Sequence, residues 1–244
     1  MYPSAQNFGP HTPGAGVPTS QAELWVTLPS MFYASTFVTG HSAWGAHGAS
    51  AQADYRQWVA TFLADLEQRP PATFDSSYAW WLLARTGAAA LIQSEPRLAA
   101  AFADWKDKAS RQIDASGKPS LDAVESFNKA AFGLKALVLS AEIARHNGGD
   151  LYEHEDPYGG SVLRRAVIKM ASYNLNPSSW TGAGPPMDPD LDELASAYEA
   201  AHSHYQDASL LDAVNLAGRP IWDLRMLGWA TLSHGNSFEL GIAP

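Results

Sequence analysis

Two charged residues in a predicted helix could carry chemistry. Glu125 and Lys129 are four residues apart, so they share one face of the helix predicted over residues 120–147. A lysine whose pKa is lowered by burial can act as a base near neutral pH. An acid placed four residues before a base is also the usual spacing of a surface ion pair, and such pairs are common. The spacing leaves a catalytic lysine and a surface pair as alternatives.

Asp75 supports a second kind of chemistry. With Glu125 it could form the pair of carboxylates that flanks the scissile bond in glycoside hydrolases. Asp75 also precedes Ser76 and Ser77 at a predicted helix start, where an aspartate accepts hydrogen bonds from unpaired backbone N–H groups. Capping is the simpler interpretation of Asp75.

The histidines form two close pairs. His41 and His47 flank Trp44 in a glycine-rich loop, and loops often carry catalytic side chains. His202 and His204 could meet at a metal only if the chain were a loop there, because on a helix they point to different sides. Separate surface histidines are favoured at that position, and no metal site is predicted.

The tryptophans are candidates for sugar binding, because an aromatic ring offers a flat apolar face. Of the 9 tryptophans, most are expected in the core, with one or two exposed in a groove. The candidates that could stack on a sugar are Trp44, Trp80, Trp81 and Trp222.

Composition narrows the function. With 244 residues and 46% apolar side chains, the chain can bury one large core, and a single domain over residues 21–244 is predicted after a Pro- and Gly-rich arm at residues 1–20. A formal charge of −9 argues against nucleic acid, and no apolar segment is long enough for a membrane span. The chain has no cysteine, no phosphate-binding loop and no visible signal peptide. We therefore expect a soluble protein without a cofactor, whose oligomeric state the sequence leaves open.

Almost every predicted element is a helix, so the predicted class is all-α. Pro29 could kink or split the first helix, and residues 222–232 remain ambiguous between helix and strand. The expected helices span residues 21–39, 52–66, 76–92, 95–115, 120–147, 159–173, 190–205 and 209–216.

Three stretches of the chain resemble the alginate lyase family of polysaccharide lyases. The most specific is SFNKAAFGLKALVLSAEIARHNGGDLY followed by DPYGGSVLRRAV, in residues 126–167. The others are TFDSSYAWWLLARTGAAALIQ and, more weakly, PIWDLRMLGWATLSHG. The resemblance implies an incomplete α/α toroid of antiparallel helical hairpins. It also implies a polysaccharide or oligosaccharide partner and a secreted or periplasmic location.

The resemblance also assigns site residues. In the family, an Asn-His pair and a Tyr act in β-elimination and an Arg helps to bind the uronate. Here Asp75 and Ser76 stand at the Asn-His positions and Tyr78 is retained. Lys129 stands at the catalytic Tyr. In addition, Asn128 replaces a His, Glu125 replaces an Arg, and Arg225 matches a substrate-binding Arg.

Three functions are therefore open. The first is a lyase in which Lys129 transfers the proton, assisted by Tyr78 or by His41 or His47. The second is a non-catalytic member that binds a glycan or a partner in polysaccharide assembly or secretion. The third is a glycoside hydrolase that uses Asp75 and Glu125.

Overall fold

The structure is a computed structural model that describes residues 19–38, 49–119, 126–186, 188–223 and 228–235. Apart from one pair of two-residue strands, the described elements are helices, which confirms the predicted all-α class. The elements are α1 (Thr19–Val38), α3 (Ala49–Glu67), α4 (Ser76–Leu91), α5 (Glu95–Gln112), α7 (Phe127–His146), α8 (Val162–Leu175), η1 (Pro177–Ser179), α9 (Asp188–Tyr205), α10 (Ala208–Ala217), β1 (Trp222–Asp223), β2 (Gly228–Trp229) and α11 (Ala230–His234).

Helices α4 and α7 form the centre of the core and run side by side in the same direction. The Trp80 indole N–H donates to the Phe132 carbonyl at 3.1 Å near their starts. Near their ends, a Cβ placed at Gly87 would lie 3.5 Å from Phe32 of α1 and 3.8 Å from Ile143 of α7. A glycine at this position lets three helices approach closely, and almost all of α4 is buried.

Side-chain caps explain where the helices begin. Asp75 accepts hydrogen bonds from the N–H groups of Ser77 and Tyr78, which confirms the predicted cap of α4. The long central helix was predicted to begin at Ser120, but its N-cap is Ser126, whose hydroxyl accepts the Lys129 N–H. Residues 120–125 are outside the described residues.

Two further boundaries differ from the prediction. Pro29 lies inside α1, which continues on both sides of it. The helix expected from Gly159 begins only at Val162, because Gly159 and Gly160 have φ values of +86° and +70° that a right-handed helix does not allow. The ambiguous segment after Trp222 contains both kinds of element, since β1 pairs antiparallel with β2 and α11 follows directly.

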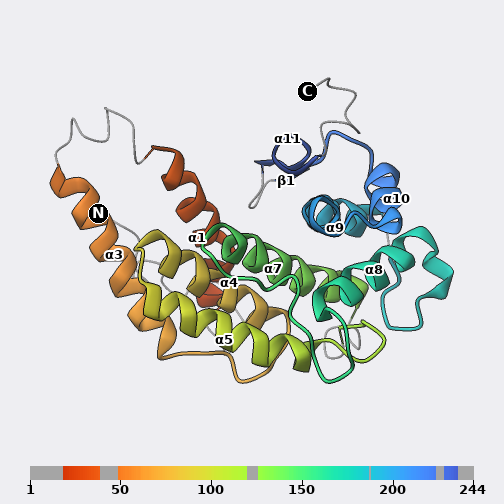
Figure 1. Cartoon of the computed structure of the whole chain (residues 1–244), viewed down its shortest axis with the longest axis horizontal. Coiled ribbons are helices and arrows are strands. Elements are labelled where there is room, and N and C mark those ends of the chain that lie inside the picture. The colour runs from red at the N-terminus through yellow and green to blue at the C-terminus, as the bar shows by residue number, and fades with distance from the viewer. Residues whose placement is uncertain (1–18, 39–48, 120–125, 187, 224–227, 236–244) are drawn as a thin grey trace.

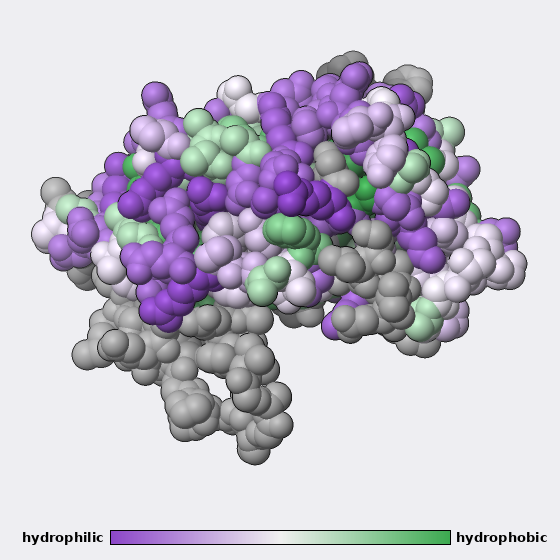
Figure 2. Space-filling model, turned by 90° about the horizontal axis from the view of Figure 1, so that it is seen from below, coloured by the Kyte–Doolittle hydropathy of each residue, from purple (hydrophilic) through white to green (hydrophobic). Residues whose placement is uncertain are grey.

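The helices follow an arc (Figure 1), with α1 and α3 at one end, α4, α5 and α7 in the middle, and α8, α9 and α10 at the other end. The β1–β2 hairpin and α11 lie on the inner side of this arc, over α7 and α9. Whether the helices close into a toroid stays a prediction. Seen from below, the outer face is largely hydrophilic, with small separate hydrophobic patches (Figure 2). Among the described helices, none is both long and apolar enough to cross a membrane.

The capping role of Asp75 can be measured directly. We expect Asp75→Ala to lower the free energy of unfolding by about 1 kcal/mol, because two N–H groups at the start of α4 lose their acceptor. Asp75→Asn keeps an acceptor oxygen and should stay close to the wild type in the same urea titration. Equal destabilisation by both variants would show that the negative charge, and not the cap, is what the fold requires.

Candidate active site

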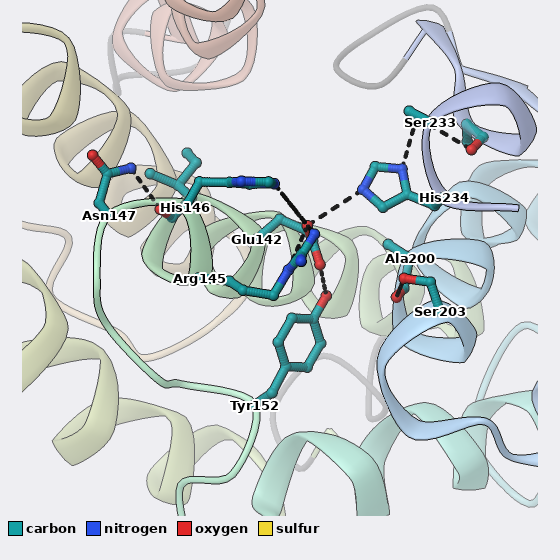
Figure 3. A network of polar contacts seen from close by, with 11 residues as sticks. Glu142, Arg145, His146, Asn147, Tyr152, Ala200, Ser203, Ser233 and His234 are labelled. Atoms are coloured by element: carbon teal, nitrogen blue, oxygen red, sulfur yellow. Dashed lines mark hydrogen bonds and ion pairs between the residues drawn. The ribbon is translucent and has the colours of Figure 1, made fainter. Parts of the chain in front are cut away.

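A buried carboxylate on α7 gathers polar side chains from three parts of the chain (Figure 3). Glu142 is only 5% exposed. Its Oε1 accepts the Tyr152 hydroxyl at 2.7 Å, and its Oε2 lies 2.9 Å from an Arg145 nitrogen and 3.3 Å from His234 Nε2. His146 Nε2 lies 3.6 Å from the same Oε2. We call these five residues the Glu142 cluster.

The local sequence explains how the cluster forms. Arg145 and His146 follow Glu142 by three and four residues, which places all three on one side of α7. The chain then turns at Gly148, whose φ is +75°, and Gly149 packs so closely on Phe102 that a Cβ there would lie 2.5 Å from the ring. These two glycines turn the chain back so that Tyr152 reaches Glu142 from the following loop.

His234 reaches the cluster from the far end of the chain. It ends α11, and its Nδ1 lies 2.7 Å from the Ser233 hydroxyl while its Nε2 faces Glu142. Figure 3 shows the imidazole pointing from α11 across to α7, so the two helices meet through this contact. Both nitrogens of the ring therefore have a polar neighbour, which fixes its orientation.

The electrostatics of the cluster are set by burial and by hydrogen bonds. Burial alone would raise the pKa of Glu142, but hydrogen bonds from His234, Arg145 and Tyr152 outweigh it and lower the pKa to about 2. Burial raises the pKa of the Tyr152 hydroxyl well above its usual value, and the neighbouring Glu142 charge adds to this. Near neutral pH, Glu142 is therefore an anion and Tyr152 a neutral donor.

Exposure divides the cluster into two layers. The side chains of Arg145 and His146 are 45% and 67% exposed, whereas those of His234 and Glu142 are only 9% and 7% exposed. Glu142, Tyr152 and His234 form the enclosed layer of the cluster. The surface of the cluster thus consists of nitrogen donors, and the carboxylate below holds them in place.

A second buried charge lies two turns earlier on α7. The Lys135 side chain is 2% exposed, and its ammonium lies 2.7 Å from Asp223 of β1 and 3.2 Å from Glu193 of α9. Ser196 also donates to Asp223. Lys135 is therefore a buried lysine of the kind considered for catalysis, but its ammonium is held by two carboxylates, which is a structural arrangement.

The predicted site residues on α4 and α7 lie apart from the Glu142 cluster. Lys129 and Asn128 are exposed on the first turn of α7. The distance along the helix from Lys129 to Glu142 is about 20 Å. Tyr78 is buried, and its hydroxyl donates to Asp104 of α5 at 3.0 Å. Among the described residues, the ring partners of Tyr78 are Phe74 and Trp81, and its hydroxyl points towards α5.

The other predicted residues fall into three groups. Trp222 of β1 is 54% exposed, as expected for one or two of the tryptophans, but it does not belong to the Glu142 cluster. Trp80 and Trp81 are 1% and 3% exposed, and their N–H groups bond to the carbonyls of Phe132 and Leu66, so both rings belong to the core and offer no face to a sugar. The remaining predicted residues lie outside the described part of the chain. They are Glu125, His41, His47, Trp44 and Arg225.

The two histidines of the second pair, His202 and His204, lie apart from each other. His202 is 3% exposed and its Nδ1 lies 3.1 Å from the Asp207 carbonyl, whereas His204 stacks on Tyr152 and contacts Glu153. The two rings thus have different neighbours, as expected for a helix. Within the described ranges, no group of three or more His, Asp or Glu side chains could hold a metal ion.

One feature of the sequence, not used in the predictions above, points to Glu142. Glu142 stands between Ala141 and Ile143 in the apolar part of the central helix, and a charge on a buried face needs partners. That signal identifies Glu142 itself. It gives no information on His234, which lies 92 residues further along the chain.

The comparison with protein families gives the class of this protein. A family model described as alginate lyase matches residues 1–180 of the 244. The chain therefore belongs to the alginate lyase family, a family of polysaccharide lyases, which confirms the resemblance seen in the sequence. The match includes Glu142, Arg145, His146 and Tyr152 but ends before His234. No curated protein matches the chain.

The structural role of Lys135 predicts a contrast between two lysines of α7. Lys135→Met should lower the free energy of unfolding by roughly 3–5 kcal/mol, because Asp223 would remain buried without its cation. Lys129→Met, on the exposed first turn, should change it by less than about 0.5 kcal/mol. Urea unfolding of both variants checks this. A similar small effect at both positions would contradict the buried pair.

The lowered pKa of Glu142 predicts a pH-dependent stability. Its pKa is about 2 when folded and ordinarily 4.5, so ionised Glu142 stabilises the fold above about pH 4.5 and this contribution is lost as the pH falls towards 2. The pKa difference corresponds to on the order of 3 kcal/mol.

At neutral pH, Glu142→Gln should therefore have a much lower free energy of unfolding than the wild type. The difference in free energy between the two proteins should become smaller as the pH falls from about 4.5 towards 2. Glu153→Gln is the matched control, because the Glu153 side chain is 60% exposed. Urea titrations at several pH values measure both variants. A difference between Glu142→Gln and the wild type that stays constant with pH would refute the lowered pKa of Glu142.

Proposed function

We propose that this protein cleaves a uronate-containing polysaccharide by β-elimination, with acid and base groups that differ from those usual in its family. Membership in the alginate lyase family supports a polysaccharide lyase. The observation that carries the proposal is the convergence of Arg145, His146 and His234 around one buried carboxylate. These side chains are the kinds of group that β-elimination of a uronate needs.

Each surface side chain has a role in this proposal. The Arg145 guanidinium has five N–H donors, and some of them donate hydrogen bonds to Glu142. The remaining donors can bind the uronate carboxylate and neutralise its charge. Neutralisation makes the proton on C5 more acidic. His146, the most exposed base of the cluster, is the candidate that accepts this proton.

The reaction then needs an acid. As the C5–H bond breaks, its electron pair forms the C4=C5 double bond and the C4–O bond to the next sugar is broken. The leaving oxygen takes a proton from a protonated imidazole, for which His234 is the candidate because Glu142 holds its ring in place. Glu142 and Tyr152 position these groups from beneath and do not contact the sugar.

Lys129 remains a separate candidate for proton transfer. It is exposed on the same helix, but at about 20 Å along α7 from the Glu142 cluster it cannot act on the same bond. If Lys129 is the acid or base, its partners must come from elsewhere, including the predicted His41 and His47. Mutations at Lys129 and in the Glu142 cluster therefore distinguish the two lyase hypotheses.

One observation favours a second function, in which the protein binds a glycan without cleaving it. Glu142 already occupies donors of both Arg145 and His234, so a substrate carboxylate meets groups that are partly neutralised. Nothing comparable supports the glycoside hydrolase, because Asp75 caps α4 and is held by its first turn.

The test is the ultraviolet absorbance of the unsaturated sugar that β-elimination produces, followed over a panel of polyuronates, with reducing ends measured on neutral glycans in parallel. Arg145→Ala and His146→Ala should lower kcat/KM by about 10- to 100-fold, because each removes a charge-assisted contact. Lys129→Ala should leave it unchanged. Arg111→Ala is the matched control, since that side chain is 53% exposed on α5 and pairs with Asp107.

The possible outcomes separate the hypotheses. Loss of activity in Lys129→Ala with normal activity in Arg145→Ala would move the site to the first turn of α7. Reducing ends without absorbance would show hydrolysis. If neither unsaturated product nor reducing ends form while binding is retained, the protein only binds its glycan.

A further inference from the structure

A group of cations on and beside α8 differs from the other charges described in this acidic protein. The Lys118 ammonium lies 4.3 Å from the centre of the Trp180 ring, and the Lys169 ammonium lies 4.9 Å from that of Tyr173. Among the described residues, neither lysine has a carboxylate within ion-pair distance. Asp114, the acid nearest to Lys118 in the chain, accepts hydrogen bonds from Ser116 and from the Lys118 backbone N–H. Burial opposes ionisation of Asp114, but these hydrogen bonds and the Lys118 charge together lower its pKa, without a direct ion pair.

A series of contacts links the two lysines to Tyr158. The rings of Tyr173 and Trp180 meet edge to face at 5.0 Å, which joins the two lysine sites. Gly117, next to Lys118, packs directly on α8, since a Cβ there would overlap the Arg165 carbonyl oxygen. Arg165 in turn lies beneath the exposed Tyr158 ring, at 5.9 Å from its centre.

Each of these groups has a defined chemistry. The two rings below the lysines are buried, so they hold the ammonium groups in place through their faces and leave the other N–H donors to an incoming group. Tyr158 is 61% exposed and presents an aromatic face of the kind that packs on sugar rings. Arg165 is already paired with the buried Asp156 and acts as a support.

We propose that Lys118, Lys169 and Tyr158 form a binding site for an acidic polysaccharide, separate from the Glu142 cluster. Only an anionic ligand with flat apolar faces uses both kinds of group, and a uronate polymer has carboxylates and sugar faces in every unit. The site shares no residue with the cluster. It would hold the polymer to a protein of net charge −9 that otherwise repels it. The proposal rests on the proposed function only for the identity of the polymer.

The experiment is a binding titration of the full chain with size-fractionated alginate oligosaccharides, followed by calorimetry at low salt. The double variant Lys118→Ala/Lys169→Ala should bind roughly tenfold more weakly than the wild type, and the difference should shrink at high salt. Lys108→Ala/Arg111→Ala is the matched control. Lys108 also lies over a ring, that of Phe74 at 4.8 Å, but both cations are paired with Asp107. The two double variants change the net charge equally.

The outcomes decide between a site and a general charge effect. An equal loss of affinity in both double variants, or no binding by the wild type, would overturn the proposal. Tyr158→Ala should weaken binding at high salt as well, and an effect that vanishes with salt would remove the tyrosine from the site. Lyase activity is read separately by absorbance. Binding that depends on the two lysines without any unsaturated product would refute the proposed function and leave this site standing.

Discussion

The fold depends on two charges that α7 carries into a buried face. Lys135 and Glu142 are seven residues apart, so they lie on the same side of the helix, and both are almost completely enclosed. An ionised group in such a place needs partners of opposite charge or strong hydrogen bonds. Asp223 and His234 meet this requirement from the segment that follows α10, so the buried charges of α7 fix where the end of the chain packs.

This constraint links the part of the chain that matches the family to the part that does not. The matched residues end at 180, and the α9–α11 region that supplies Glu193, Asp223 and His234 follows. A third buried pair, Arg219 with Glu199, holds the same segment on α9 at 2.6 Å. Three charge contacts thus attach the hairpin and α11 to the helices beneath them. The position of His234 in the cluster is a consequence of this attachment.

The features that could be predicted from the sequence are those that depend on residues close together in the chain. The all-α class, the Asp75 cap and most helix ends depend on residues within one or two turns of each other, and these predictions were confirmed. The start of α7 was missed because Ser126 and Ser120 both read as helix-start residues, and only the geometry shows which one caps.

The candidate site was beyond local reasoning for a different reason. Glu142 stands out as a charge in an apolar stripe, and Arg145 and His146 follow it at helical spacing. Its other two partners, Tyr152 and His234, lie ten and 92 residues away, and no spacing rule predicts them. Trp80 and Trp81 were predicted as residues that stack on a sugar, because aromatic rings offer flat apolar faces. Both lie in the core instead, where their N–H groups donate to backbone carbonyls. The position of a side chain within the packed layers decides its role, and the sequence alone does not give that position.

The acidic character of the chain determines which cations can attract a polyuronate. A net charge of −9 repels such a polymer at long range, but salt screens that repulsion over about 8–10 Å, so the local arrangement of cations decides whether binding occurs. In the Glu142 cluster the cations surround a buried anion and are oriented by it, which suits a reacting centre that needs fixed geometry. On and beside α8 the two lysines lie over neutral rings and not over a carboxylate, which suits attraction of a polymer. The same residue types thus serve two purposes, according to whether a carboxylate or an aromatic ring lies beneath them.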